Sequence, residues 1–266
     1  MDISVSAESS PVLSGKTIAG IPCLNTASHI VQVVASTLPF VDEVVVVDDG
    51  STDNTGELAR QAGATVLTHP RNMGVGAALR TLFEYASAHD AAVLVTLDGD
   101  GQHYPEDIPG LVQPVLEGRA SMVLGSRFLP VSYPRPVVNM PRYRAFGIRV
   151  ITFLFNVASG CRVTDSQCGL RAYDARALRE LTPIARGFEW SVELPVRARA
   201  KGLRMVEVPV GVLYHSAGST MNPIRQGARL AVAVLRLRAN AVLARWRRKL
   251  RRQTGGKSSP TGAHCS

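Results

Sequence analysis

Two short apolar runs that end in paired aspartates constrain the fold of this chain more than any other feature. The run EVVVV (43–47) leads into Asp48 and Asp49, and the run AVLV (92–95) leads towards Asp98 and Asp100. Runs that are short, apolar throughout and rich in β-branched residues are typical of strands buried on both faces of a parallel sheet. Because ligands bind beyond the carboxyl ends of such strands, these acids are expected at a binding site.

Apolar runs of this kind alternate with stretches of helical spacing along most of the chain. Strands are expected at 17–21, 43–47, 64–68, 92–95, 121–126 and 204–210. Helices are expected at 27–38, 54–62, 76–89, 105–117, 146–158, 174–181 and 189–201. A proline-rich connector is expected at 127–144, and a loop at TDSQCGLRAYD (164–174). The alternation predicts an α/β fold with a mostly parallel sheet covered by helices on both faces.

The composition is typical of a globular protein with one large domain. The chain has 266 residues, of which 45% are hydrophobic and 19% are charged. No apolar run reaches the roughly 18 residues that a bilayer-spanning helix needs. Residues 1–15 lack the basic start and apolar stretch of a signal peptide, so they are expected to form a flexible tail. The four cysteines form no C-x-x-C pair, which favours reduced thiols and a cytoplasmic location.

The net charge of +9 comes from one segment near the C-terminus. Residues 225–252 contain nine arginines, one lysine and no acid, whereas residues 1–224 contain 19 basic and 21 acidic side chains. Apolar residues recur there at helical spacing, at Val232, Leu235, Ala239, Val242, Trp246 and Leu250. The pattern predicts a basic amphipathic helix over 223–252 on an anionic membrane surface, with a solvated basic tail as the alternative. Nucleic-acid binding is disfavoured because Trp246 is the segment's one aromatic residue.

The spacing of Asp98 and Asp100 predicts a metal site. Alternate residues of an extended segment point the same way, so the two carboxylates can share one cation. A hard divalent cation prefers oxygen ligands and would offset the repulsion between the acids. Mg²⁺ takes one or two protein carboxylates and completes its shell with substrate phosphates, which favours a phosphate-bearing substrate.

An ordered set of motifs resembles the family 2 glycosyltransferases of the GT-A fold. The motifs are IPCLN (21–25), VVDDGSTDNT (46–55), RNMGVGAAL (71–79), LDGDGQHYPEDI (97–108), GSR (125–127), DSQCGLRAY (165–173) and EVPV (207–210). Within that family the chain is most similar to the dolichyl-phosphate or polyprenyl-phosphate mannose and glucose synthases. The expected organisation is a GT-A domain over 16–222, the basic helix over 223–252 and a disordered tail over 253–266.

The resemblance implies roles for individual residues. The donor nucleotide would contact Pro22, Asn25, Asp48, Asp49 and Asp98, with His215, Gly218 and Ser219 in a loop that closes over the diphosphate. Mg²⁺ or Mn²⁺ would be held by Asp98, Asp100 and Gln102. The acceptor phosphate would contact Arg127, Gln167 and either Arg142 or Arg144. Asp100, Arg127 and Asp165 are the expected catalytic residues, Asp165 lying in the loop that faces the acceptor.

Some positions depart from the family or carry a weaker signal. Thr26 stands where the family usually has a glutamate, Ile148 falls near a usual serine, and His215 and Met221 stand where the closing loop often has arginine and lysine. His103 is expected to be an exposed loop side chain, with a diphosphate contact as the alternative. Trp190 is expected in the core, with a sugar-binding platform as the alternative. Glu189 is expected to act either in catalysis or in helix capping.

The leading hypothesis is an inverting, metal-dependent hexosyltransferase. It would move mannose or glucose from GDP-mannose or UDP-glucose to a polyprenyl or dolichyl phosphate on the cytosolic face of a membrane. A phosphate monoester is largely dianionic at neutral pH, so it needs positive charge to position it and no general base. A hydroxyl acceptor, with Asp165 or Glu189 as the base, is the alternative within the family. A nucleotidyltransferase and a non-catalytic membrane-surface adaptor are the alternatives from other classes.

Overall fold

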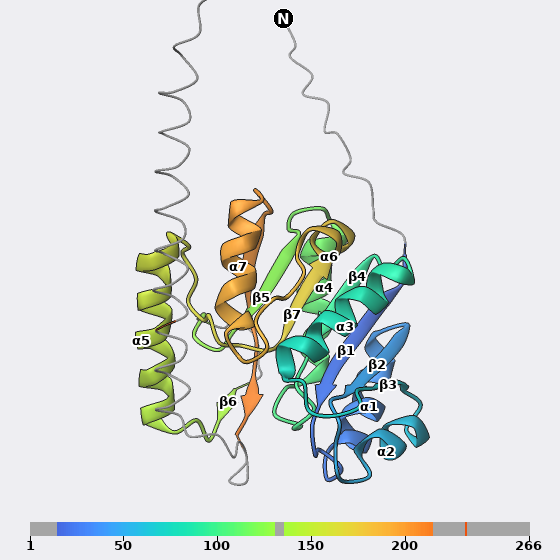
Figure 1. The fold of residues 1–266 in the computed structure, drawn as a ribbon. Helices are drawn as coiled ribbons and strands as arrows, with labels where there is room; N and C mark the ends of the chain where they lie inside the picture. Colours follow the sequence, from blue (N-terminus) through green and yellow to red (C-terminus); the bar gives the residue numbers. More distant parts are fainter. Residues whose placement is uncertain (1–14, 131–135, 215–231, 233–266) are drawn as a thin grey trace, which may run out of the picture.

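The computed structural model describes residues 15–130 and 136–214 together with residue 232, and it is built around one seven-stranded sheet (Figure 1). The strands of this sheet are β1 (Thr17–Cys23), β2 (Glu43–Asp48), β3 (Thr65–Thr68), β4 (Val93–Thr96), β5 (Met122–Ser126), β7 (Arg171–Asp174) and β8 (Met205–Pro209). A second sheet pairs β6 (Val137–Val138) with β9 (Val212–Leu213). The helices are α1 (Ile30–Thr37), α2 (Thr55–Gln61), α3 (Val75–Ala88), α4 (Ile108–Leu116), α5 (Arg142–Ser159), α6 (Ala175–Glu180) and α7 (Trp190–Ala200), with short 3-10 turns η1 (Leu38–Phe40) and η2 (Pro105–Asp107).

The prediction of a mostly parallel sheet is confirmed. The strand order is β3-β2-β1-β4-β7-β5-β8, and β7 alone runs antiparallel to its two neighbours. The prediction of a loop over 164–174 is wrong at its end, because Arg171–Asp174 form β7. Its sequence, RAYD, conceals the strand because it begins and ends with a charged residue. Arg171 is nevertheless fully buried, and Ala172 and Tyr173 pack into the cores on opposite faces of the sheet.

Helices cover both faces of the sheet, as the alternation of elements predicts. Along β2, Val45 and Val47 enter one core, and Val44 and Val46 enter the other. The first core is completed by α3, α6 and α7, and the second by α1, α2 and α4. Burial on both faces explains why this strand is an unbroken run of valines, since each buried side chain of this size contributes about 1.5–3 kcal/mol.

The direction of β7 determines what meets at the carboxyl edge of the sheet. The carboxyl ends of β1, β2, β4, β5 and β8 lie at this edge because these strands are mutually parallel. Antiparallel β7 begins at the same edge, so the loop that precedes it, 164–170, arrives beside the segments that leave β4 and β5. Segments far apart in the sequence therefore converge at one place.

The small sheet ties two of these segments together. Pairing of β9 with β6 continues beyond the strands, because the Tyr214 N–H donates to the Val138 carbonyl at 3.0 Å. On the other side of β9, the Leu213 N–H donates to the Gln102 carbonyl at 2.8 Å. The chain that follows β8 thus connects the loop after β4 with the connector after β5.

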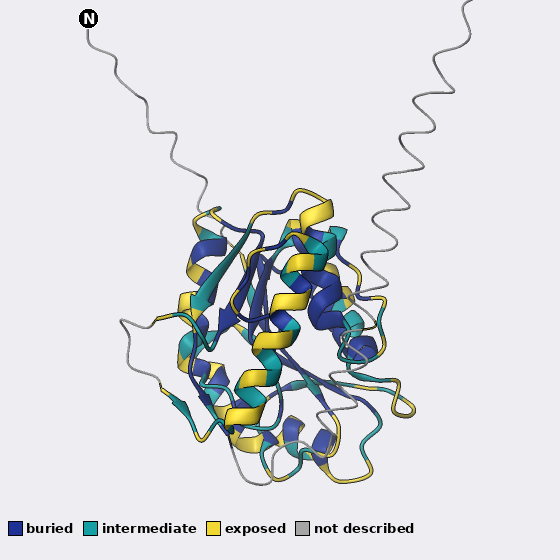
Figure 2. Ribbon diagram, turned by 90° about the vertical axis from the view of Figure 1, so that its left-hand side faces the viewer, coloured by how far each residue is buried: buried dark blue, intermediate teal, exposed yellow. Residues whose placement is uncertain are grey.

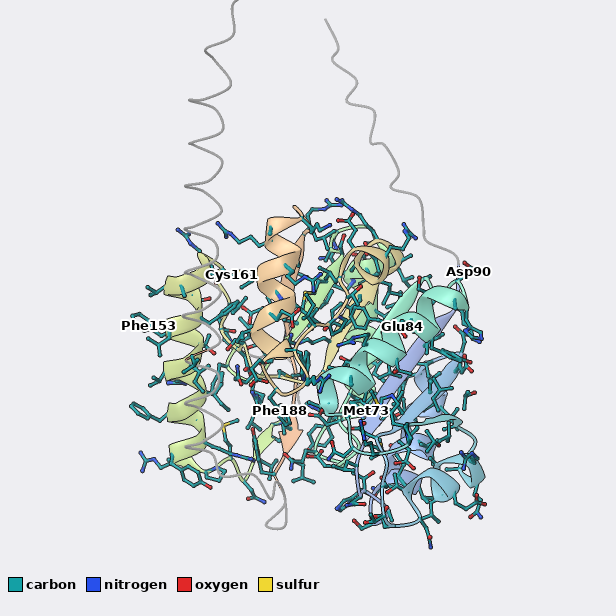
Figure 3. The ribbon with its side chains drawn as sticks, in the orientation of Figure 1. Met73, Glu84, Asp90, Phe153, Cys161 and Phe188 are labelled. Atoms are coloured by element: carbon teal, nitrogen blue, oxygen red, sulfur yellow. The ribbon has the colours of Figure 1, made fainter. Side chains whose placement is uncertain are left out.

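Helix α5 stands apart from the other helices. It buries only Thr152 and Phe155 among its 18 residues, whereas Phe146 is 70% and Phe153 is 66% exposed. Figure 2 shows exposed turns along its length, and in Figure 3 Phe153 points away from the body of the protein. Among the described helices, none combines the length and the apolar character that crossing a bilayer requires.

Several predicted features lie outside the described residues. They are most of the N-terminal tail (1–15), His215, Gly218 and Ser219 of the closing loop, the basic helix (223–252) apart from residue 232, and the tail (253–266).

The packing of α3 against the loop before α7 gives a test of the fold. A Cβ atom added to Gly76 would lie 1.8 Å from the Ala185 carbonyl oxygen, and the Gly76 N–H already donates to the Arg186 carbonyl at 2.9 Å. We expect Gly76→Ala to lower the free energy of unfolding by about 1–3 kcal/mol, because backbone must move to admit the methyl group. Urea unfolding measures this change.

Gly110→Ala is the matched control. Gly110 lies in α4, and a Cβ atom there would meet no atom within 4 Å. We expect this variant to unfold at the same or a higher urea concentration, since alanine favours a helix by about 0.5–1 kcal/mol over glycine. Equal unfolding midpoints for Gly76→Ala and the wild type would contradict the packing described here.

Candidate active site

The two aspartates after β2 are engaged with backbone donors. Asp48 accepts a hydrogen bond from the Ser51 N–H at 2.9 Å. Asp49 accepts from the N–H groups of Met73 and Gly74, at 2.9 and 2.7 Å, and its Oδ1 lies 2.6 Å from His69 Nδ1. Asp49 therefore holds the loop 69–74 against the end of β2.

The loop after β1 is tied to the loop after β2 in both directions. The Asn25 N–H donates to Ser51 Oγ at 2.9 Å, and Asn25 Oδ1 accepts from the Thr52 N–H at 2.8 Å. Asn25 adopts a positive φ of 54°, which asparagine tolerates better than most residues. Pro22 lies in β1, next to Val47 of β2. The structure thus brings Pro22, Asn25 and the aspartate pair together, as the motifs predict.

Asp98 and Asp100 lie in the loop after β4, together with Gln102. Asp100 Oδ1 accepts from the Gln102 N–H at 3.0 Å. Burial and then the charge of Asp98 raise the pKa of Asp100 above its usual range. Burial alone would also raise the pKa of Asp98, but the hydrogen bond and charge of His103, with the charge of Arg127, lower it.

These residues fit a hard divalent cation. Two carboxylates and one amide oxygen are suitable ligands, and a cation would offset the repulsion between Asp98 and Asp100. Among the described residues, no group of three or more His, Cys, Asp or Glu side chains could hold a metal ion. A cation here would therefore rely on Asp98, Asp100, Gln102 and oxygen atoms of the substrate.

The structure corrects the expectation for His103. Its side chain is only 6% exposed, and its Nε2 lies 3.2 Å from Asp98 Oδ2. Its Nδ1 is buried and has no hydrogen-bond partner in the described part of the chain. The sequence pattern misses this because the Val212 strand closes over His103 from a position more than 100 residues away.

A glycine brings the loop before β7 against Asp98. A Cβ atom on Gly169 would lie 2.6 Å from Asp98 Oδ2 and 2.8 Å from Oδ1. No larger residue fits here without moving the Asp98 carboxylate.

An ion pair dominates the other side of the site. Arg127, at the end of β5, donates from Nε to Asp165 Oδ2 at 2.6 Å and from Nη2 to Asp165 Oδ1 at 2.9 Å. The pair is buried, and the charge and hydrogen bonds of Arg127 overcome the effect of burial and lower the pKa of Asp165. Gln167 donates its N–H to Asp165 Oδ1 at 2.9 Å. The structure thus brings together Arg127, which follows β5, with Asp165 and Gln167 of the loop before β7, three residues that the motifs predict on the acceptor side.

Arg144 and Arg142, the two alternatives for the second acceptor arginine, have different surroundings in the structure. The Arg144 guanidinium lies over the ring of Tyr214, with Cζ 5.3 Å from the ring centroid, whereas Arg142 is exposed. Arg127 Nη1 donates to the Tyr214 hydroxyl at 2.7 Å. Arg144 is therefore the arginine of α5 that shares a partner with Arg127.

Arg171 is a site residue that the sequence analysis misses. It donates to the carbonyls of Ser166, Cys168 and Ser191 at 2.9–3.0 Å and lies over the Trp190 ring, with Cζ 4.6 Å from the centroid. Arg171 therefore stabilises the conformation of the loop 164–170. Trp190 is 3% exposed, which confirms that it belongs to the core.

Comparison with known proteins identifies the class and then the family. The arrangement of the sheet, with an acidic loop at its carboxyl edge, is that of a GT-A glycosyltransferase. Residues 19–182 match the model of glycosyl transferase family 2, so the chain belongs to that family. A UDP-N-acetylglucosamine–dolichyl-phosphate N-acetylglucosaminyltransferase of Methanococcus voltae is 32% identical over 192 residues, or 65% of this chain and 75% of the relative. An undecaprenyl-phosphate mannosyltransferase of Micrococcus luteus is 31% identical over 212 residues, or 77% and 84%.

A solved structure shares the fold. Glucosyl-3-phosphoglycerate synthase of Mycobacterium tuberculosis, in complex with Mn²⁺, uridine diphosphate and glucosyl-3-phosphoglycerate, superposes with a TM-score of 0.64. The match covers 84% of this chain and 78% of that chain at 24% identity. At that identity the likeness is one of fold.

The acidic pair after β4 gives a direct test of cation binding. Asp100→Asn retains the acceptor for the Gln102 N–H but removes one charge. We expect Mn²⁺-dependent binding of a nucleoside diphosphate to weaken at least about tenfold, while thermal stability stays the same or rises because the repulsion from Asp98 is lost. Calorimetric titration measures the binding. Asp90→Asn is the control, since Asp90 is exposed and lies at the opposite end of the sheet (Figure 3). Unchanged binding in Asp100→Asn would remove this residue from the metal site.

Gly169→Ala tests the same site without changing a charged group. The added methyl group would displace the Asp98 carboxylate, because its position is 2.6 Å from Oδ2. We expect the affinity for Mn²⁺ and nucleoside diphosphate to fall by about tenfold or more, whereas Gly110→Ala keeps the wild-type affinity. If Gly169→Ala binds Mn²⁺ as the wild type does, the contact does not position Asp98.

Proposed function

We propose that this protein is an inverting, divalent-metal-dependent hexosyltransferase that uses a polyprenyl or dolichyl phosphate as the acceptor. The donor would be GDP-mannose or UDP-glucose. The relatives named for dolichyl-phosphate and undecaprenyl-phosphate acceptors support the acceptor class. The observation that carries the proposal is the cluster of Arg127 and Arg144 around Tyr214, on the acceptor side of the site.

The charge of this cluster suits a phosphate nucleophile. A phosphate monoester dianion attacks without losing a proton, but it must be held near a donor that is itself negatively charged. Guanidinium groups bind phosphate oxygens with directional hydrogen bonds and remain charged at all physiological pH values. Arg127 and Arg144 would hold the acceptor oxygen in line with the anomeric carbon, and direct attack there inverts that centre.

A hydroxyl acceptor would need a general base, and Asp165 is poorly suited to that role. Both of its oxygens accept hydrogen bonds from Arg127, and its lowered pKa makes it a weak base. We assign Asp165 a positioning role, in which it holds the Arg127 guanidinium at the end of β5. Glu189 lies at the N-cap of α7 and makes no capping hydrogen bond, so the assay below includes an alcohol acceptor.

On the donor side, Asp98, Asp100 and Gln102 would hold Mg²⁺ or Mn²⁺. When bound, the ion would act as a Lewis acid towards the diphosphate leaving group. The loop 69–74, held by Asp49, and Asn25 with Pro22 would bind and orient the nucleoside. His215, Gly218 and Ser219 are proposed to close over the diphosphate.

A lipid acceptor places the protein at a membrane surface. The exposed face of α5 has aromatic and aliphatic side chains at helical spacing, and Arg142 and Arg149 lie exposed on the same helix. The segment 225–252 adds ten positive charges. Each arginine or lysine near an anionic leaflet contributes about 1 kcal/mol, so we propose peripheral binding on the cytosolic face.

The acceptor assay tests the proposal. The wild-type protein is incubated with each nucleotide sugar, Mg²⁺ or Mn²⁺, and either a polyprenyl phosphate or the unphosphorylated polyprenol. We expect nucleoside diphosphate to be released with the phosphate alone, and the product to be labile in mild acid because it is a glycosyl phosphate. Transfer to the alcohol with an acid-stable product would establish the hydroxyl alternative. Release of pyrophosphate would point to a nucleotidyltransferase.

A further inference from the structure

Tyr214 contacts both arginines of the acceptor side. Its hydroxyl accepts a hydrogen bond from Arg127 Nη1 at 2.7 Å, and its ring lies under the guanidinium of Arg144. Arg127 comes from the end of β5 and Arg144 from the first turn of α5, and Tyr214 is the described residue in contact with both. The side chain is therefore placed to set the separation of the two guanidinium groups.

The backbone of Tyr214 is fixed relative to the metal site. Its N–H donates to the Val138 carbonyl, and the preceding residue donates to the Gln102 carbonyl at 2.8 Å. Tyr214 is 6% exposed, so its position is set by packing as well as by hydrogen bonds. Because Gln102 belongs to the proposed donor site, the same short segment relates the acceptor arginines to the donor.

The hydroxyl of Tyr214 stays protonated beside the two cations. Burial raises its pKa above the ordinary value, although Arg127 and Arg144 act in the opposite direction. The oxygen accepts from Arg127, and no described residue accepts the hydroxyl hydrogen. Tyr214 therefore brings no negative charge to the two arginines, in contrast to Asp165, which pairs with Arg127.

We propose that Tyr214 is a positioning residue that holds Arg127 and Arg144 as one phosphate-binding unit for the acceptor. The inference rests on the proposed function, because it assigns the two arginines to an acceptor phosphate. It goes further by naming the residue that makes two separate arginines act together. It also predicts that the two contacts of Tyr214, through the hydroxyl and through the ring, contribute separately to acceptor binding.

Two substitutions separate these contacts. Tyr214→Phe removes the hydrogen bond to Arg127 and keeps the ring under Arg144, whereas Tyr214→Leu removes both. We expect Tyr214→Phe to raise the KM for a short-chain polyprenyl phosphate about tenfold, as for the loss of a hydrogen bond to a charged group. Tyr214→Leu is expected to raise it further, by about another threefold, through loss of the cation–π contact. The KM for the nucleotide sugar is expected to stay within about twofold of the wild type, with kcat changed less than the acceptor KM.

Tyr85→Phe is the matched control. The Tyr85 hydroxyl donates to a charged partner, Glu43, at 2.8 Å, but it lies on α3 away from the carboxyl edge of the sheet. Tyr85→Phe is expected to lower the thermal stability by about as much as Tyr214→Phe does. It is expected to keep the wild-type KM for both substrates. It separates the effect of losing a buried hydrogen bond from an effect on the acceptor.

A double-variant cycle supplies the second measurement. If Tyr214 acts through Arg144, the effects of Tyr214→Leu and Arg144→Met on acceptor KM are expected to be less than additive. Additive effects would overturn the inference, as would an unchanged acceptor KM in Tyr214→Phe or an equal rise in both substrate KM values. If the wild type transfers sugar to the alcohol and not to the phosphate, the proposed function fails and the inference fails with it. If the wild type uses the phosphate and the Tyr214 variants behave as the wild type does, only the inference fails.

Discussion

The arrangement of this site depends on how buried negative charge is offset at one edge of a sheet. Four aspartates there are neutralised or solvated by the protein itself: Asp48 by a turn, Asp49 by two N–H groups, Asp98 by His103 and Asp165 by Arg127. Asp100 accepts the N–H of Gln102, and burial together with the charge of Asp98 raises its pKa above the usual range. The divalent cation proposed for this site would offset the repulsion between Asp98 and Asp100.

The reversed strand makes this concentration of charge possible. Because β7 begins where its neighbours end, the loop 164–170 brings Asp165 to Arg127 and Gly169 to Asp98. Arg171, fully buried at the start of β7, anchors that loop through three carbonyls and the face of Trp190. One loop thus contacts both Asp98, proposed for the donor side, and Arg127, proposed for the acceptor side. The buried guanidinium of Arg171 fixes the conformation of this loop.

The sequence predicts the fold class and most of the helices and strands, because strands buried on both faces and amphipathic helices leave strong local patterns. It also predicts the acids after β2 and β4, since these directly follow recognisable strands. It fails where long-range contacts decide the outcome. Arg171 is fully buried at the start of β7, His103 is paired with Val212, and Tyr214 contacts Arg127 after β5 and Arg144 of α5. Nothing in the local sequence of these three residues encodes their partners.

The two-residue strand β9 has a consequence for how this protein could diversify. Its Leu213 N–H donates a hydrogen bond to the Gln102 carbonyl, and Tyr214 is the next residue of the chain. A change of register in β9 would therefore disturb both the Gln102 loop and the position of Tyr214, so this strand is expected to resist insertion and deletion. The outer face of α5 carries no such double constraint, because most of its side chains are exposed. New acceptor preferences are expected to arise there, by substitutions that leave the proposed donor site unchanged.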